Sequence, residues 1–209
     1  MPVRLLILTV LPLLLAAACA PPPGGQVRPH ALLAAPAMDA VTWTDGFWGD
    51  RFATCRNKTI PAIRRMFLDP RNEGAQLTRF RYAAGLQNVN PGGKHWADGD
   101  CYKWIETMAR VYAVKKDAAL ATQMDEWIDV IARAQEPDGY ISTNIGHDTN
   151  ARFRSPHHHE LYNMGHLLTA AAVHCRATGR KTFLAVARKL GDYLDRTFRP
   201  TPARLVNFP

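Results

Sequence analysis

The chain has 209 residues, of which 47% are hydrophobic and 21% are charged, a composition that is typical of a globular protein and excludes a disordered or collagen-like one. Its formal net charge is +8 at pH 7, but the basic residues are dispersed among acidic ones and accompany no nucleic-acid-binding motif. We therefore expect a solvated basic surface and no nucleic-acid partner.

The N-terminus has the pattern of an export signal. Arg4 precedes an apolar run from Leu5 to Leu15, and the small residues Ala16 to Ala18 follow that run. The run is short for a membrane span, and helix-breaking residues come soon after it. We predict a signal peptide over residues 1–18 and export from the cytoplasm.

Cys19 lies directly after these small residues and resembles the acylated cysteine of a bacterial lipobox. Ala16 occupies the position where leucine is preferred, so ordinary cleavage after Ala18 is the alternative. We predict acylation of Cys19, which would make the protein a periplasmic or cell-envelope lipoprotein that touches the membrane only through this anchor. Residues 19–40, rich in Pro, Gly and Ala, are predicted to be a tether, and residues 41–209 the folded domain.

After Val41 the chain is predicted to be a succession of amphipathic helices, because apolar residues recur at three-to-four spacing and no strand-like alternation of useful length occurs. Five helices are expected: one opened by Asn57–Pro61, one from Asp98–Asp100 through Tyr112, one from Asp117 to before Glu136, one from His159 to Thr178, and one from Phe183 to about Phe198. An aspartate of the Asp98–Asp100 segment is expected to cap its helix. Short connections between such helices predict an all-α fold of helical hairpins.

The segment His159–His166 carries the most informative polar residues. His159 and His166 are seven residues apart, about two helical turns, so they should project from nearly the same face. Leu167–Val173 follows and is apolar, which suggests that this face lines an interior pocket. The alternatives are a helix cap, a core histidine, or a solvated loop at His157–His159. The spacing is not His-Glu-x-x-His and no third ligand is evident, so no metal site is expected here.

The helices differ in sequence and loop length, which favours hairpins wound into a toroid with a central cleft over a uniform solenoid. Several aromatic residues are candidates for stacking on a sugar, with core packing as the alternative: Trp43, Phe47, Trp48, Trp96 and Trp104. No Cys-x-x-Cys motif occurs among the three remaining cysteines, Cys55, Cys101 and Cys175. Three cysteines can form at most one disulfide among themselves.

Four ordered segments resemble the N-terminal part of the β-L-arabinofuranosidase family (glycoside hydrolase family 127-like, six-hairpin glycosidase superfamily). They fall between about Val41 and Phe198. The segments are Gly46–Trp48 with Arg51 and Asn57–Pro61; Asp98–Glu106; Gln135–Tyr140; and His159–His166 with Ala177–Arg180. The resemblance implies an (α/α)6 barrel, of which about five of twelve helices are expected here, so that the toroid would be incomplete.

The resemblance also implies retaining hydrolysis of L-arabinofuranosides or related plant-type glycans by a zinc-bound cysteine thiolate, with a glutamate as acid/base. The family places both downstream of the part that is matched. We therefore expect zinc in complete family members but no cofactor in this chain, no identifiable catalytic residue, and no hydrolysis by the chain alone. The resemblance places His159, alone among these residues, at a sugar hydroxyl. We expect Tyr162 or His166 to assist it.

Two other functions are compatible with the sequence. One is a non-catalytic carbohydrate-binding half-barrel. The other is a different six-hairpin glycosidase or lyase, in which Asp98, Asp100 or Glu160 would act as the acid, although these residues could equally be caps or buried hydrogen-bond partners.

Overall fold

The computed structural model describes residues 36–71 and 75–201, which contain helices and loops but no strand. The elements are α1 (Gly46–Thr54), the π-helical turn η1 (Cys55–Thr59), α2 (Ile60–Leu68), α3 (Gln76–Ala83), α4 (Ala97–Lys115), α5 (Ala118–Ala134), the 3₁₀ turn η2 (Pro156–His158), α6 (Glu160–Thr178) and α7 (Thr182–Phe198). The all-α prediction is confirmed. The predicted signal peptide, Cys19 and most of the predicted tether lie outside the described residues.

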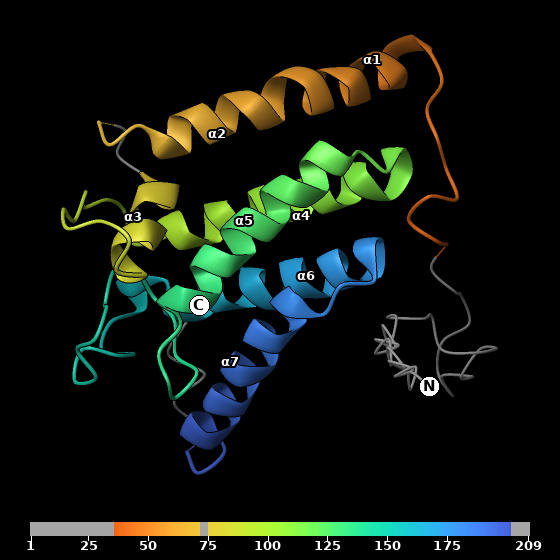
Figure 1. Ribbon diagram of the computed structural model, residues 1–209. Coiled ribbons are helices and arrows are strands. Elements are labelled where there is room, and N and C mark those ends of the chain that lie inside the picture. The colour runs from red at the N-terminus through yellow and green to blue at the C-terminus, as the bar shows by residue number, and fades with distance from the viewer. Residues whose placement is uncertain (1–35, 72–74, 202–209) are drawn as a thin grey trace, which may run out of the picture.

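The helices form an arm and two hairpins (Figure 1). α1, η1 and α2 make one continuous arm across the top of the view, α4 and α5 form a hairpin below it, and α6 and α7 form a second hairpin. α4 packs more extensively against α6 than any other pair of elements does. The connections within the two hairpins are short, which makes each pair antiparallel neighbours.

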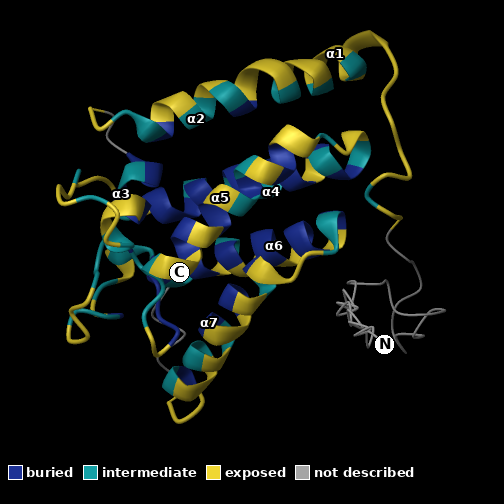
Figure 2. Cartoon of the chain, viewed as in Figure 1, coloured by how far each residue is buried: buried dark blue, intermediate teal, exposed yellow. Residues whose placement is uncertain are grey.

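The core lies where α4, α5 and α6 face one another, as Figure 2 shows by the concentration of buried residues there. Each helix contributes large apolar side chains at helical spacing. They are Tyr102, Ile105 and Met108 of α4; Met124, Trp127 and Ile131 of α5; Met164 and Leu167 of α6; and Phe183 and Leu190 of α7. Burial of each aliphatic or aromatic side chain of this size stabilises the fold by about 1.5–3 kcal/mol. No helix among the described residues is long and apolar enough to cross a membrane.

The N-terminal arm begins earlier than the sequence pattern predicted. Helix starts at Gly46, passes through the π-helical turn that contains Asn57, and continues as α2. Pro61 lies in the first turn of α2, where its missing N–H costs least. α3 was not predicted, because its eight residues give too short a window for periodicity to be recognised.

The predicted aspartate cap of α4 is wrong. The residue that precedes this helix is Trp96, and no side chain caps the helix. Asp98 turns instead to the loop between α5 and α6, where its carboxylate accepts from the backbone N–H of Thr143. A carboxylate cap does occur at α5, where Asp117 Oδ1 accepts from the backbone N–H of Ala119 at 3.0 Å.

Candidate functional site

The N-terminal ends of α4 and α6 meet closely because residue 99 is glycine. Its backbone N–H donates to Asn163 Oδ1 at 2.9 Å, and Asn163 Nδ2 donates to the His95 carbonyl oxygen at 2.8 Å. A Cβ at residue 99 would lie 2.8 Å from Asn163 Oδ1 and 3.3 Å from the Tyr162 ring. Asn163 therefore joins the two helix ends, and Gly99 leaves the space for it.

Four aromatic and imidazole side chains line up beside this junction. The ring centroids of Trp96 and His159 are 5.6 Å apart, those of His159 and Tyr162 5.9 Å, and those of Tyr162 and His166 4.7 Å. We call these four residues the imidazole–aromatic row. The structure thus brings together all three residues predicted to bind sugar, and adds Trp96 from the sequence candidates.

The row is partly open to solvent in the described part of the chain. Trp96 is 43% exposed and Tyr162 is 39% exposed, while His159 and His166 are half-buried. The expectation of an enclosed polar face therefore does not hold for these residues. Lys103 of α4 reaches the row, where its Nζ donates to the Tyr162 hydroxyl at 2.6 Å.

The backbone of His159 is in the left-handed region, with φ 54° and ψ 27°. Its Nδ1 lies 2.8 Å from the His157 carbonyl oxygen. Because a carbonyl oxygen can only accept, Nδ1 carries a proton, and neutral His159 has its lone pair on Nε2. Nε2 is thereby suited to accept a hydrogen bond from a hydroxyl group.

His166, at the other end of the row, is held in the neutral form. Burial and the nearby ammonium group of Lys103 lower the pKa of His166 below its usual value. At neutral pH its ring can therefore both donate and accept a hydrogen bond, as recognition of a hydroxyl-rich ligand requires.

Two buried carboxylates anchor the loop between α5 and α6 next to the row. Asp98 accepts from both the backbone N–H and the hydroxyl of Thr143, and Glu160 accepts from the Tyr140 hydroxyl at 2.5 Å and the Phe153 N–H at 2.8 Å. Burial raises the pKa of both carboxyl groups. Both are satisfied structural acceptors, which does not favour the reading of either as a catalytic acid.

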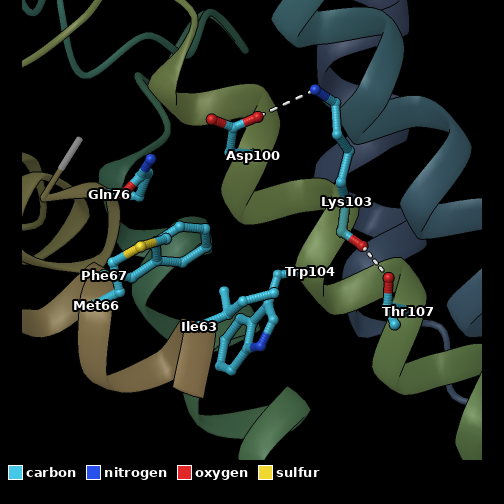
Figure 3. A pocket seen from close by; sticks show the side chains of 8 residues that line it. All are labelled: Ile63, Met66, Phe67, Gln76, Asp100, Lys103, Trp104 and Thr107. Carbon is cyan, nitrogen blue, oxygen red and sulfur yellow. Dashed lines mark hydrogen bonds and ion pairs between the residues drawn. The ribbon is translucent and has the colours of Figure 1, made fainter. Parts of the chain in front are cut away.

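Asp100, the third acidic candidate, lies at the edge of a groove between α2 and α4 and pairs with Lys103 Nζ at 3.0 Å. The groove has a volume of about 300 Å³ and a largely apolar lining, and Figure 3 shows its residues: Ile63, Met66, Phe67, Gln76, Asp100, Lys103, Trp104 and Thr107. Lys103 contacts both this groove and Tyr162, and so connects it to the row. Sequence reasoning did not single out Lys103, although this residue lies within the Asp98–Glu106 segment, and it missed Gln76, which belongs to no recognised motif.

The remaining aromatic candidates have other roles. Trp104 is buried, and its Nε1 donates to the Ile60 carbonyl oxygen at 3.2 Å, so it is a core residue. Trp43, Phe47 and Trp48 are exposed on and just before α1, where the Phe47 and Trp48 rings contact each other at 5.1 Å. None of these three has a ring contact with the row.

The described residues do not fit a zinc–thiolate site. Within residues 36–71 and 75–201, no group of three or more His, Cys, Asp or Glu side chains is placed to hold a metal ion. Burial raises the pKa of the Cys55 and Cys101 thiols, which keeps both protonated at neutral pH and makes both poor ligands and nucleophiles.

Comparison with known proteins links this chain to one family. The model of one protein family, described as the β-L-arabinofuranosidase, glycoside hydrolase family 127 catalytic domain, matches residues 40–207. A non-reducing end β-L-arabinofuranosidase of Bifidobacterium longum subsp. longum is 33% identical over 135 residues, which cover 62% of this chain and 20% of that protein.

Two solved structures have the same arrangement of helices. A family 127 β-L-arabinofuranosidase from Geobacillus stearothermophilus T6 is 32% identical with a TM-score of 0.70, over 74% of this chain and 25% of that one. A second family 127 β-arabinofuranosidase is 30% identical with a TM-score of 0.61, over 77% of this chain and 26% of that one. The chain therefore spans about a quarter or less of the length of these relatives.

Proposed function

Because the chain belongs to glycoside hydrolase family 127, the β-L-arabinofuranosidase family, we propose that its imidazole–aromatic row binds an L-arabinofuranosyl residue. The observation that carries this proposal is the hydrogen bond from His159 Nδ1 to the His157 carbonyl, which leaves Nε2 free to accept from a sugar hydroxyl. The exposed rings of Trp96 and Tyr162 supply apolar surface against which the C–H groups of a sugar can pack.

The other members of the row have distinct roles in this proposal. His166 is neutral at physiological pH and completes the hydrogen bonding to hydroxyls. Lys103 holds the Tyr162 hydroxyl at 2.6 Å and so fixes the ring that separates the two imidazoles. The ligand is a carbohydrate, and nothing in the proposal requires nucleic acid.

We propose that the activity of the complete family domain, hydrolysis of L-arabinofuranosides or related glycans, is not performed by the described residues alone. Asp98 and Glu160 are buried acceptors, and the Cys55 and Cys101 thiols are protonated. The resemblance implies zinc in complete members, and such a metal would need ligands other than those described here. The function supported for this chain is sugar binding without turnover.

Substitution of His159 tests the proposal. His159→Ala removes one hydrogen bond to a hydroxyl, so binding of methyl β-L-arabinofuranoside should weaken by about 0.5–1.5 kcal/mol, roughly 2- to 13-fold in Kd. The measurement is a calorimetric or NMR titration of the purified chain, with the melting temperature as a check on folding.

His157→Ala is the matched control, because the His157 side chain is exposed while its backbone carbonyl, which orients His159, is retained. This variant should bind as the unmodified chain does. Equal affinity of the His159→Ala variant would remove His159 from the site. Turnover of an aryl L-arabinofuranoside by the purified chain, abolished by a substitution within it, would overturn the proposal of binding without hydrolysis.

We also propose that the protein is exported and acylated at Cys19. The support is the apolar run and the Ala16–Ala18 segment before this cysteine. Mass spectrometry of the mature N-terminus should find a diacylglyceryl group on Cys19. A mature N-terminus without a lipid, or one that begins at another residue, would contradict acylation but not export.

A further inference from the structure

Two strained backbone positions border the segment that presents His159. Phe153 and His159 both have φ 54°, in the left-handed region that side-chain-bearing residues rarely occupy. Such conformations persist only where the surrounding structure determines them. What holds these two residues in place therefore decides where the His159 ring lies.

Glu160 closes the segment between these two positions. Glu160 immediately follows His159 in the chain, and its Oε2 accepts from the Phe153 backbone N–H at 2.8 Å. The Glu160 side chain therefore links the two strained positions, Phe153 and His159. Its other oxygen, Oε1, accepts from the Tyr140 hydroxyl at 2.5 Å. Tyr140 is itself fully buried, so the carboxylate is fixed to the core at the same time.

Local hydrogen bonds complete the turn within the closed segment. Ser155 Oγ accepts from the His157 backbone N–H at 3.3 Å, and the His159 backbone N–H donates to the Pro156 carbonyl at 3.2 Å. The His158 ring stacks on the ring of His95, which lies just before α4, with the ring centroids 5.1 Å apart. These contacts shape the turn, and the Glu160 carboxylate joins its two ends.

We propose that Glu160 is a positioning residue: its carboxylate closes the Phe153–His159 turn and thereby holds the His159 ring where it meets Trp96, Tyr162 and the sugar. The inference rests on the proposed sugar binding for its functional consequence. The Glu160 side chain is buried and both its oxygens accept hydrogen bonds from the protein, so the proposal gives it no direct contact with the sugar.

The test compares Glu160→Ala with Glu160→Gln. Alanine removes both acceptor oxygens, whereas the glutamine amide can still accept from the Phe153 N–H and can donate to the Tyr140 hydroxyl. In the alanine variant we expect the His159 ring signals in NMR spectra of histidine-labelled protein to shift or broaden, and methyl β-L-arabinofuranoside to bind at least about fivefold more weakly. In the glutamine variant the His159 ring signals should return to their positions in the unmodified chain. The affinity for methyl β-L-arabinofuranoside should return to within about twofold of that of the unmodified chain.

Leu167→Ala separates positioning from general loss of stability. Leu167 is a fully buried residue of the same helix and is not part of the turn, so its truncation should lower the melting temperature and leave the His159 signals in place. If Glu160→Ala does not fold, Tyr140→Phe removes one of the two donors to the carboxylate and should cause a smaller shift of the same signals.

Unchanged His159 signals in the folded Glu160→Ala variant, or in Tyr140→Phe where the alanine variant does not fold, would overturn the positioning role. Equal shifts in Leu167→Ala would also overturn it. Absence of sugar binding by the unmodified chain would instead overturn the proposed function, while the His159 signals, measured without sugar, would still decide whether Glu160 positions the ring.

Discussion

Buried polar side chains in this protein differ in whether their hydrogen-bonding atoms find partners. Asp98 and Glu160 each accept two hydrogen bonds from the loop between α5 and α6. His174 of α6 is equally buried, yet neither of its ring nitrogens has a partner. A buried group of the first kind fixes a loop, whereas one of the second kind lowers stability.

The pH dependence of stability should show the cost of His174. Burial, followed by the positive charge of Arg180, lowers the pKa of His174 to about 4 from 6.5. In the unfolded chain His174 binds a proton below pH 6.5, whereas in the folded chain it binds one only near pH 4. Between these two pH values the proton stabilises the unfolded state, so His174 makes stability fall as the pH drops from 6.5 to 4. Between pH 8 and pH 4.5 the loss from His174 should be about 2.5 kcal/mol.

Urea unfolding of His174→Leu at several pH values measures this contribution. The variant should be more stable at each pH, because leucine leaves no unpaired nitrogen. Between pH 8 and pH 4.5 its unfolding free energy should fall by about 2.5 kcal/mol less than that of the unmodified chain. The exposed His157→Gln provides a control that should follow the unmodified chain. Parallel pH profiles for His174→Leu and the unmodified chain would contradict the assignment.

At the scale of elements, the approach of α4 to α6 depends on where the two helices have glycine. Gly99 lies at their junction, where a Cβ would be 2.8 Å from Asn163 Oδ1, while Gly165 of α6 has no atom within 4 Å of its Cβ position. One glycine is required by a close contact, and the other is an ordinary helical position filled by a poor helix former.

Alanine substitutions at these two glycines should therefore have opposite effects. Gly99→Ala should destabilise the fold by about 1–3 kcal/mol, since Asn163 must move and the helices must separate. Gly165→Ala should stabilise it by about 0.5–1 kcal/mol, because alanine loses less backbone entropy on folding. Chemical denaturation of both variants measures the two values, and a neutral Gly99→Ala would show that α4 and α6 can separate without cost.

The elements that the sequence predicted well are those with long apolar stripes. α5 and α7 are 17-residue helices whose buried residues recur at three-to-four spacing, so periodicity was enough to place them. α3 is too short for that signal, and the π-helical turn interrupts the period between α1 and α2. Local pattern determines long helices, whereas short and irregular ones depend on tertiary contacts.

The site was predictable to the extent that its residues are close in sequence. His159, Tyr162 and His166 follow from helical spacing, and the structure places their rings in contact. The bond from Gly99 to Asn163 joins residues 64 positions apart, and the one from Lys103 to Tyr162 joins residues 59 apart. Such contacts depend on how α4 meets α6, which no single-helix pattern specifies.

At the scale of the whole molecule, α1 has an aromatic surface that nothing in the described structure covers. No residue of this helix is buried, and Phe47 and Trp48 are 61% and 66% exposed. Arg51 contacts the Phe47 ring at 5.0 Å without covering it. Burying a side chain of this size is favourable by about 1.5–3 kcal/mol, so adjacent exposed aromatic rings favour association with another surface.

We therefore expect the purified chain to self-associate through α1. In sedimentation velocity its weight-average mass should rise above the monomer mass as concentration increases, and the double variant Phe47→Gln, Trp48→Gln should stay closer to the monomer, because glutamine retains helix propensity and removes the apolar surface. Val89→Gln is the control, since Val89 is exposed but lies in the loop between α3 and α4. Removal of one exposed apolar residue outside α1 should leave association unchanged. If the unmodified chain stays monomeric at every concentration, the α1 aromatic surface is tolerated in water. If the double variant associates as strongly as the unmodified chain, the contact lies elsewhere on the molecule.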